Sequence, residues 1–270
     1  MSVLQRGDED PSVHSLQELL LGLRAPLADP PAHFGLWTEA SVFVLQHCAG
    51  IEPDGVYGPQ TAAILSSGHL PADFAKLIVN PLRVIAGVPY KSQRDNEHDP
   101  SSTCNVTALA MAMDYLGVSK SDPQAQLEDE LYELIRSPSG LAFYKQTNPQ
   151  LHEKGIPANQ VYDNLVWAAE QYGLRASFSG KRSWQQIAQE IQDGRPVLLS
   201  TTLTASGHIV LLVGLTATGD LVCHDPYGDF KRGYKSKAGA FRIYPSHCIA
   251  QHVKEVHSDE KWALFLRALA

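Results

Sequence analysis

Several features are scarce in this chain of 270 residues, and each scarcity argues against a class of protein. No run of 18 apolar residues occurs, so the sequence predicts no membrane insertion. The 22 basic residues are scattered and stand against 29 acidic ones, and the net charge of −7 argues against a nucleic-acid partner. The four cysteines lack Cys-x-x-Cys spacing, which is typical of a reducing compartment rather than a disulfide framework.

The first 24 residues lack the apolar core of a secretory signal peptide, because charged side chains occur at Arg6, Asp8, Glu9 and Asp10. We therefore expect synthesis in the cytoplasm without a signal peptide. With 44% hydrophobic residues, the chain has the composition of a folded protein. Its length predicts one large domain or two unequal ones, either with a sizeable core.

The N-terminal part reads as a small helical module. Apolar spacing and capping residues predict helices over 10–24, 38–47 and 61–68. An aromatic-Gly-x-x-Thr-x-Ala motif begins at Phe34 and again at Tyr57, and Leu-Gln pairs occur at 16–17 and 45–46. One interpretation of this repeat is binding; the other is that its Gly and Thr residues only start helices.

The composition shifts toward proline and small residues between 70 and 81, which predicts a domain boundary there. We expect one domain over 1–75 and a second over 80–270. In the second, periodicity predicts helices first and strands afterwards, an α+β fold ending in an antiparallel sheet. The expected helices are 104–116, 124–135, 158–172 and 184–192, and the expected strands are 196–202, 208–215, 221–225, 241–244 and 262–266.

Cys104 is the first candidate for chemistry. It follows a polar loop over 92–103 and begins a predicted helix, where unpaired backbone N–H groups stabilise a thiolate. The alternative is a small buried hydrophobic residue, which is the usual role of a free cysteine. The polar loop before the helix favours the interpretation of Cys104 as a nucleophile, since a cysteine in the core does not require a polar segment beside it.

A nucleophilic cysteine requires a base and a group that orients the base. His208 opens one apolar strand and Asp225 closes the next, so a hairpin turned at 216–219 would place these side chains together. Taken separately, a strand-end histidine and an aspartate before Pro226 are ordinary surface features. Their coincidence across one hairpin, in a chain with a helix-initiating cysteine, favours catalysis.

Two cysteine-histidine pairs offer the elements of a zinc site, namely Cys223-His224 and His247-Cys248. Adjacent residues on a strand point to opposite faces, so such a pair chelates one ion poorly. The sequence therefore predicts no metal and no other cofactor.

Four blocks resemble the papain-like cysteine peptidases related to the bacteriocin-leader (double-glycine) processing peptidases. These blocks are Ser92-Gln93, Thr103-Cys104-x-x-Thr107, Gly207-His208 and Asp225-Pro226-Tyr227-Gly228. The resemblance covers most of 84–266 and implies a nucleophile at Cys104, a general base at His208 and its orienting group at Asp225. It also implies that Gln93 helps to form the oxyanion hole, where its amide could donate together with the backbone N–H of Cys104.

Residues 4–65 resemble the three-helix peptidoglycan-binding domain found at the ends of bacterial cell-wall hydrolases. The most specific block is Asp54-Gly55-x-Tyr57-Gly58-Pro59-x-Thr61, while a proline-containing insertion at 25–32 departs from the common form. The resemblance implies peptidoglycan as the partner. The substrate-binding residues that we expect in this domain are Phe34, Thr38, Asp54, Tyr57 and Thr61.

Together these observations predict a cell-wall hydrolase that cuts an amide bond of the peptide stem or cross-link, possessing a wall-binding domain. The lack of a signal peptide suits a phage-type lysin that acts on the wall once released, and otherwise a cytoplasmic enzyme. Two alternatives stay open: a peptidase that trims a leader from a precursor, and a non-catalytic wall-binding protein. An amidase and an endopeptidase would use the same triad.

Overall fold

The computed structural model describes residues 3–249 and 260–269. It divides into two compact units. The first, here called the helical unit, comprises residues 1–84, 214–222 and 243–246, and the remaining residues form the second, here called the mixed unit. Among the described residues, no helix is long and apolar enough to span a membrane.

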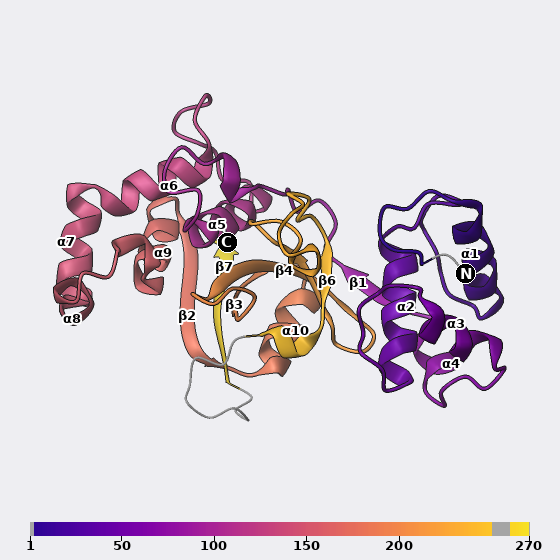
Figure 1. The fold of residues 1–270 in the computed structure, drawn as a ribbon. Helices are drawn as coiled ribbons and strands as arrows, with labels where there is room; N and C mark the ends of the chain where they lie inside the picture. The colour runs from indigo at the N-terminus through magenta and orange to yellow at the C-terminus, as the bar shows by residue number, and fades with distance from the viewer. Residues whose placement is uncertain (1–2, 250–259, 270) are drawn as a thin grey trace. The chain divides into compact units, whose positions relative to one another are not determined.

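The helical unit contains three main helices and a short fourth (Figure 1). These are α1 (Pro11–Gly22), α2 (Leu36–Cys48), α3 (Pro59–Ser66) and α4 (Phe74–Leu77). The predicted cap is present at α1, where the Asp10 carboxylate accepts from the Ser12 N–H at 2.7 Å and Pro11 is the first helical residue. Helices α2 and α3 begin two residues earlier than predicted, directly after Gly35 and Gly58.

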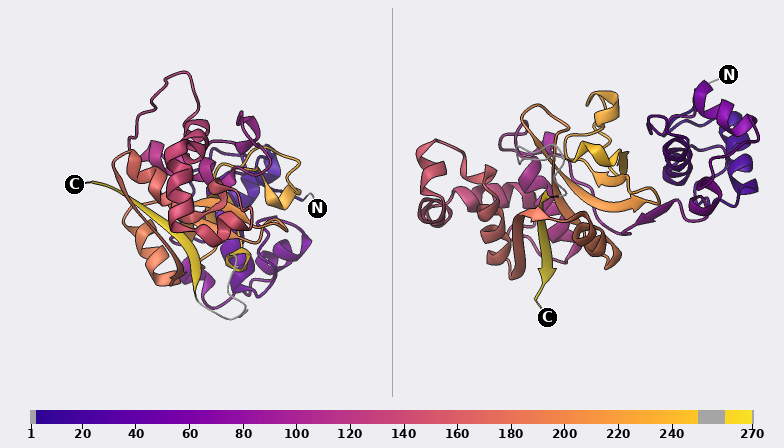
Figure 2. Two further views of the ribbon diagram at one scale, coloured as in Figure 1. Left: turned by 90° about the vertical axis from the view of Figure 1, so that its left-hand side faces the viewer. Right: turned by 90° about the horizontal axis from the view of Figure 1, so that it is seen from below.

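In the mixed unit, helices pack around a twisted sheet. Its helices are α5 (Cys104–Tyr115), α6 (Leu127–Arg136), α7 (Pro138–Thr147), α8 (Pro149–Glu153), α9 (Tyr162–Gln171) and α10 (Trp184–Gln192). Figure 2 shows α6 to α9, in shades of pink, gathered together. The prediction matches α10 at both ends, because Ser183 and Gln186 form a capping box there.

The strands form a single sheet in the order β2-β7-β3-β4-β5-β6, with β1 paired to β4. Their bounds are β1 (Leu82–Val84), β2 (Leu174–Arg182), β3 (Val197–Thr201), β4 (His208–Thr216), β5 (Leu221–His224), β6 (Arg242–Tyr244) and β7 (Lys261–Ala268). The pairs β2/β7, β7/β3, β3/β4 and β1/β4 are antiparallel. This mixture of helices and antiparallel sheet confirms the predicted α+β class.

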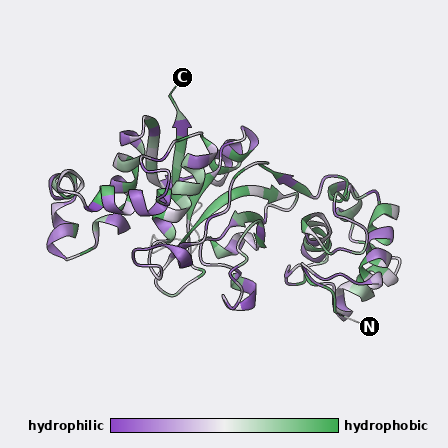
Figure 3. Cartoon of the chain, turned by 90° about the horizontal axis from the view of Figure 1, so that it is seen from above, coloured by the Kyte–Doolittle hydropathy of each residue, from purple (hydrophilic) through white to green (hydrophobic). Residues whose placement is uncertain are grey.

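The middle of the sheet is buried on both faces. Every residue of β3 and nearly every residue of β4 is buried, which explains why both read as unbroken apolar runs rather than alternating ones. Figure 3 shows the central strands in the green of hydrophobic residues. Strand β2 was not predicted, because its sequence is half polar and its pairing depends on β7, more than eighty residues later.

The two faces of the β2/β7 pair carry different helices. On one face, Phe178 of β2 stacks on Tyr162 of α9 with ring centroids 4.1 Å apart. On the other, Arg267 of β7 bonds to Glu190 of α10. Because alternate residues of a strand face opposite sides, α9 and α10 cover opposite faces of the sheet.

Candidate active site

Cys104 lies at the first position of α5 and is half-buried. The polar loop before it is held by buried hydrogen bonds from the Asn96 amide to the hydroxyls of Thr103 and Thr107, at 3.0 and 2.9 Å. Thr103 in turn donates to the Asp99 carbonyl at 3.0 Å. The loop therefore fixes the start of the helix at Cys104, where the sequence predicted it. It thereby also fixes the position of the Cys104 sulfur atom.

His208 and Asp225 meet in the interior of the mixed unit. The His208 Nε2 atom lies 2.7 Å from Asp225 Oδ1, and both residues are buried. Since Nε2 is occupied by the carboxylate, Nδ1 is the nitrogen left for Cys104, with which the imidazole also interacts. The structure thus brings together the three residues of the predicted triad.

The hairpin that joins β4 and β5 differs in register from the prediction. Its turn is closed by the Thr216 N–H, which donates to the Asp220 carbonyl at 2.9 Å, so the turn centres on residue 218, whereas His208 directly opposite Asp225 would require a centre between 216 and 217. Strand β5 ends at His224, and Asp225 comes directly after it. His208 and Asp225 therefore meet through their side chains rather than as a registered pair in the ladder.

Asp225 is fixed from several sides. Its N–H donates to the Gly239 carbonyl at 2.9 Å, and its Oδ1 accepts from the Tyr227 N–H at 3.0 Å. A side chain at Gly239 would collide with the Asp225 carbonyl group, so glycine is required by this close approach. The carboxylate is thus oriented before any substrate binds.

The environment of His208 favours its protonated form. Burial lowers the pKa of the imidazole, but the hydrogen bonds to Asp225 and Cys104 outweigh burial and raise that pKa to about 10. At neutral pH the arrangement therefore suits an imidazolium held between a carboxylate and a sulfur atom.

Gln93 lies beside the nucleophile, on a 3₁₀ turn over Gln93–Asp95. Its N–H donates to the Pro226 carbonyl at 2.9 Å, and its Nε2 donates to the Pro100 carbonyl at 3.0 Å. Its Oε1 is buried and has no hydrogen-bond partner in the described structure. Gln93 and Cys104 line the same cavity.

That cavity has a volume of about 490 Å³ and draws its walls from five parts of the chain. Its polar lining includes the three side chains Gln93, Cys104 and His208, and its aromatic lining includes Tyr162, Tyr227 and Trp262. A volume of this size accommodates a ligand of several residues or sugar units in part. The candidate nucleophile and base therefore face a space that a substrate can enter.

Sequence reasoning missed an aromatic wall beside the triad. The Tyr234 ring lies edge-on to His208 and to Tyr227, with centroids 6.0 and 5.0 Å apart. Arg94 holds this wall, since its Nη2 donates to the Tyr234 carbonyl at 2.6 Å and its guanidinium lies 4.2 Å from the Tyr227 ring. Tyr227 was quoted within the Asp-Pro-Tyr-Gly block, but no local signal marks Tyr234.

Tyr234 adopts a conformation that non-glycine residues rarely take, with a φ of 58°. Its hydroxyl is buried, and the side chain interacts with the Asp225 carboxylate. Burial, together with the neighbouring charge of Asp225, raises the pKa of Tyr234 well above its ordinary value. Strained backbone of this kind concentrates at functional sites.

Of the two cysteine-histidine pairs weighed for zinc, Cys223-His224 has other roles. Cys223 is completely buried, and burial raises the pKa of its thiol well above the ordinary value. His224 Nε2 lies 3.0 Å from the Val88 carbonyl oxygen, and its Nδ1 accepts from the Phe241 N–H at 3.0 Å. Both nitrogens of His224 are thus engaged, which leaves none for a metal.

In the helical unit, the repeated motif has a structural explanation. The buried amide of Gln17 donates to the carbonyls of Pro30 and His33 and approaches the Thr38 hydroxyl. In the same way, the amide of Gln46 donates to the Val56 carbonyl and the Thr61 hydroxyl. Each Leu-Gln pair therefore fixes the loop that starts the next helix. The insertion over 25–32 contributes to the first loop, because Asp29 caps α2 through the N–H groups of residues 37 and 38.

These positions correct part of the binding-site prediction. Phe34 and Thr38 have no exposed area and Thr61 is 2% exposed, so their side chains cannot touch a polymer in this structure. Asp54 is exposed and Tyr57 is half-buried, so both stay predicted contacts. Asp54 also bonds to the Gln46 amide at 2.6 Å, which shows that it supports the loop as well.

Comparison with known proteins gives two family matches. A sequence model of the Peptidase_C39 like family matches residues 85–245, more than half of the chain. A second model, described as "Putative peptidoglycan binding domain", matches residues 9–65. No curated protein matches the chain.

Among solved structures, a "putative C39-like peptidase from Bacillus anthracis" is similar at 16% sequence identity, over 70% of this chain and 98% of that chain. The TM-score is 0.45. The assignment rests on the sequence matches, which confirm both resemblances inferred from the motifs. The chain carries a peptidoglycan-binding domain and belongs to the Peptidase_C39 like family.

Proposed function

We propose that this protein is a cell-wall hydrolase that cuts an amide bond in the peptide stem or cross-link of peptidoglycan. Cys104 is the nucleophile, His208 the general base, Asp225 its orienting group, and Gln93 a donor of the oxyanion hole. The observation that carries the proposal is the placement of His208 between Asp225 and Cys104, at the wall of a cavity of about 490 Å³.

The chemistry follows from the atoms that face one another. The Cys104 thiol gives its proton to Nδ1 of His208 before the attack, the resulting thiolate attacks the amide carbonyl carbon, and the imidazolium then donates that proton to the leaving amine. Water, deprotonated by the same imidazole, hydrolyses the thioester and releases the acid. The negative oxygen of each tetrahedral intermediate lies near the start of α5, where backbone N–H groups lack helical acceptors.

The helical unit anchors this enzyme to its insoluble substrate. Tethering raises the local concentration of the mixed unit at the wall without altering the transition state of the hydrolysis. A phage-type lysin fits this arrangement, acting on the wall after release from the cytoplasm.

The decisive experiment compares the full chain with its Cys104→Ala variant on purified peptidoglycan. We expect fragment release by the native chain, complete loss of release in the variant, and retention of both folding and sedimentation with the wall. Mass spectrometry of the fragments identifies the bond. Cys223→Ala, at a cysteine buried away from the cavity, is the matched control and keeps activity.

Turnover that persists in Cys104→Ala would overturn the cysteine mechanism. Cleavage of a leader peptide without any release from peptidoglycan would favour the processing peptidase instead. Slow alkylation of Cys104 by iodoacetamide, at the rate of an ordinary free cysteine, would favour a non-catalytic wall-binding protein.

A further inference from the structure

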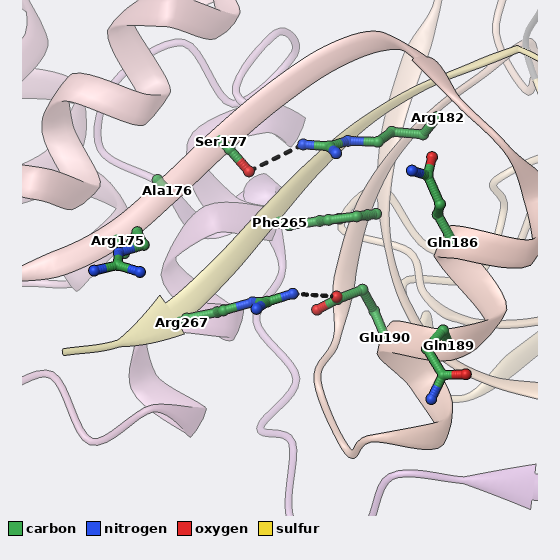
Figure 4. Close-up of a pocket in the computed structure, with 9 residues that line it drawn as sticks. All are labelled: Arg175, Ala176, Ser177, Arg182, Gln186, Gln189, Glu190, Phe265 and Arg267. Atoms are coloured by element: carbon green, nitrogen blue, oxygen red, sulfur yellow. Dashed lines mark hydrogen bonds and ion pairs between the residues drawn. The ribbon is translucent and has the colours of Figure 1, made fainter. Parts of the chain in front are cut away.

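We infer a second binding site, for an organic oxyanion, on the face of the sheet that α10 covers. A cavity of about 520 Å³ lies there between β2, β7 and α10, away from the candidate catalytic residues. Figure 4 shows Phe265 at its centre, with Arg182 and Arg267 on either side of the ring. The rest of the polar lining consists of Arg175, Ser177, Gln186, Gln189 and Glu190.

Two of the arginines in this site face each other across the sheet. Arg175 of β2 and Arg267 of β7 are directly opposite one another in the antiparallel ladder. Like charges at such positions repel and destabilise the sheet. An arrangement of this kind is explained when an anion bridges the two guanidinium groups.

A β-bulge brings the third arginine to the same face. Regular alternation from Ser177 would direct Arg182 to the opposite side of β2, but the register shifts between Ser179 and Arg182. Arg182 accordingly donates to the Ser177 hydroxyl at 3.0 Å, and its guanidinium lies 4.3 Å from the Phe265 ring. Its Nε is buried and has no hydrogen-bond partner in the described structure.

The carboxylate at the edge of this site is already saturated. Glu190 is 5% exposed and bonds to Arg195 Nε at 2.6 Å and to Arg267 Nη2 at 2.6 Å. Within residues 3–249 and 260–269, no carboxylate bonds to Arg175 or Arg182. Two positive charges therefore stay uncompensated in a chain whose net charge is −7.

These features define the chemistry of the ligand. Guanidinium groups bind carboxylate and phosphate groups through paired hydrogen bonds, and Phe265 offers an apolar surface for a small carbon frame. The two glutamine amides add donors and acceptors for hydroxyl groups. The site fits a small organic molecule with two anionic groups, either a polycarboxylate or a phosphate ester.

The experiment titrates the full chain, in dilute chloride buffer, with citrate in one arm and inorganic phosphate in the other. Calorimetry gives the affinity, and the melting temperature gives the stabilisation that ligand binding produces. We expect saturable binding of at least one anion, with citrate preferred for a carboxylate site and phosphate for a phosphate site. The double variant Arg175→Gln/Arg182→Gln should lose affinity by about tenfold or more, as removal of charged hydrogen bonds predicts.

Arg136→Gln is the matched control, because Arg136 lies on α6, does not line this cavity and removes the same charge. It should keep the native affinity and the anion-dependent rise in melting temperature. Arg175→Gln without ligand should melt no lower than the native chain, since it removes a repulsion. The inference is overturned by absence of saturable binding, by equal loss in Arg136→Gln, or by a lower melting temperature of unliganded Arg175→Gln.

Discussion

Buried polar side chains are treated differently in the two units of this protein. In the helical unit, the amides of Gln17 and Gln46 make hydrogen bonds through both their nitrogen and their oxygen atoms. Near His208, by contrast, the Gln93 side-chain oxygen is buried without a hydrogen-bond partner in the described structure. An unsatisfied buried polar group costs about 1–3 kcal/mol. Side chains that hold loops in place therefore have all their polar groups paired, whereas a side chain at the candidate active site keeps a polar atom unpaired for a substrate.

The largest expected effect comes from a change at the candidate active site, next to His208. Asp225→Asn should keep the geometry around His208, yet lower kcat by about 10³-fold to 10⁴-fold, because an amide does not stabilise the imidazolium. Release of fragments from peptidoglycan measures the rate. Asp122→Asn, at an exposed loop position, is the control and should leave kcat unchanged. A near-native rate for Asp225→Asn would mean that another group orients His208.

The next effect is a pH dependence of stability. The His208 pKa is raised to about 10 in the folded chain and is about 6.5 in an unfolded one, so the pairing contributes fully below pH 6.5. As pH rises toward 10, the unfolded chain has lost this proton while the folded chain still holds it, and the contribution falls.

Urea denaturation at about pH 6 and about pH 9 measures this loss. We expect the free energy of unfolding to fall more steeply for the native chain than for Asp225→Asn, in which the carboxylate that raises the His208 pKa is gone. Parallel pH profiles for the two proteins would show that the pairing does not hold the proton.

The smallest expected effect comes from a change at a buried amide of the helical unit. Gln46→Ala removes the buried amide that fixes the loop before α3, and should destabilise the helical unit by about 1–3 kcal/mol. Amide hydrogen exchange over residues 9–65 measures this locally, and cleavage of a short soluble stem peptide should be unchanged. Gln60→Ala, at an exposed position in α3, is the matched control. Equal exchange in both variants would remove the structural role of Gln46.

Several elements could be predicted because their signals are local. A cap and a proline mark α1, a capping box marks α10, and unbroken apolar runs mark β3 and β4. Helix α7 (Pro138–Thr147) was missed because only Gly140 and Tyr144 of its residues are buried, which leaves no regular apolar spacing. Strand β2 was missed because its sequence is half polar and it pairs with β7, which is distant in the chain. The same reason explains the error at the β4/β5 turn, where residue types were compatible with more than one register.

The sequence by itself determined the family, the α+β class and the order of the candidate Cys104, His208 and Asp225, because motifs and hydrophobic periodicity are written in neighbouring residues. Only the tertiary structure decided that Nδ1 of His208 faces Cys104, that Tyr234 adopts a strained conformation beside Asp225, and that Thr38 and Thr61 are interior residues. It also decided that a bulge turns Arg182 toward Arg175 and Phe265. Side-chain direction and charge proximity depend on strand register and on packing between distant segments, which no local pattern encodes.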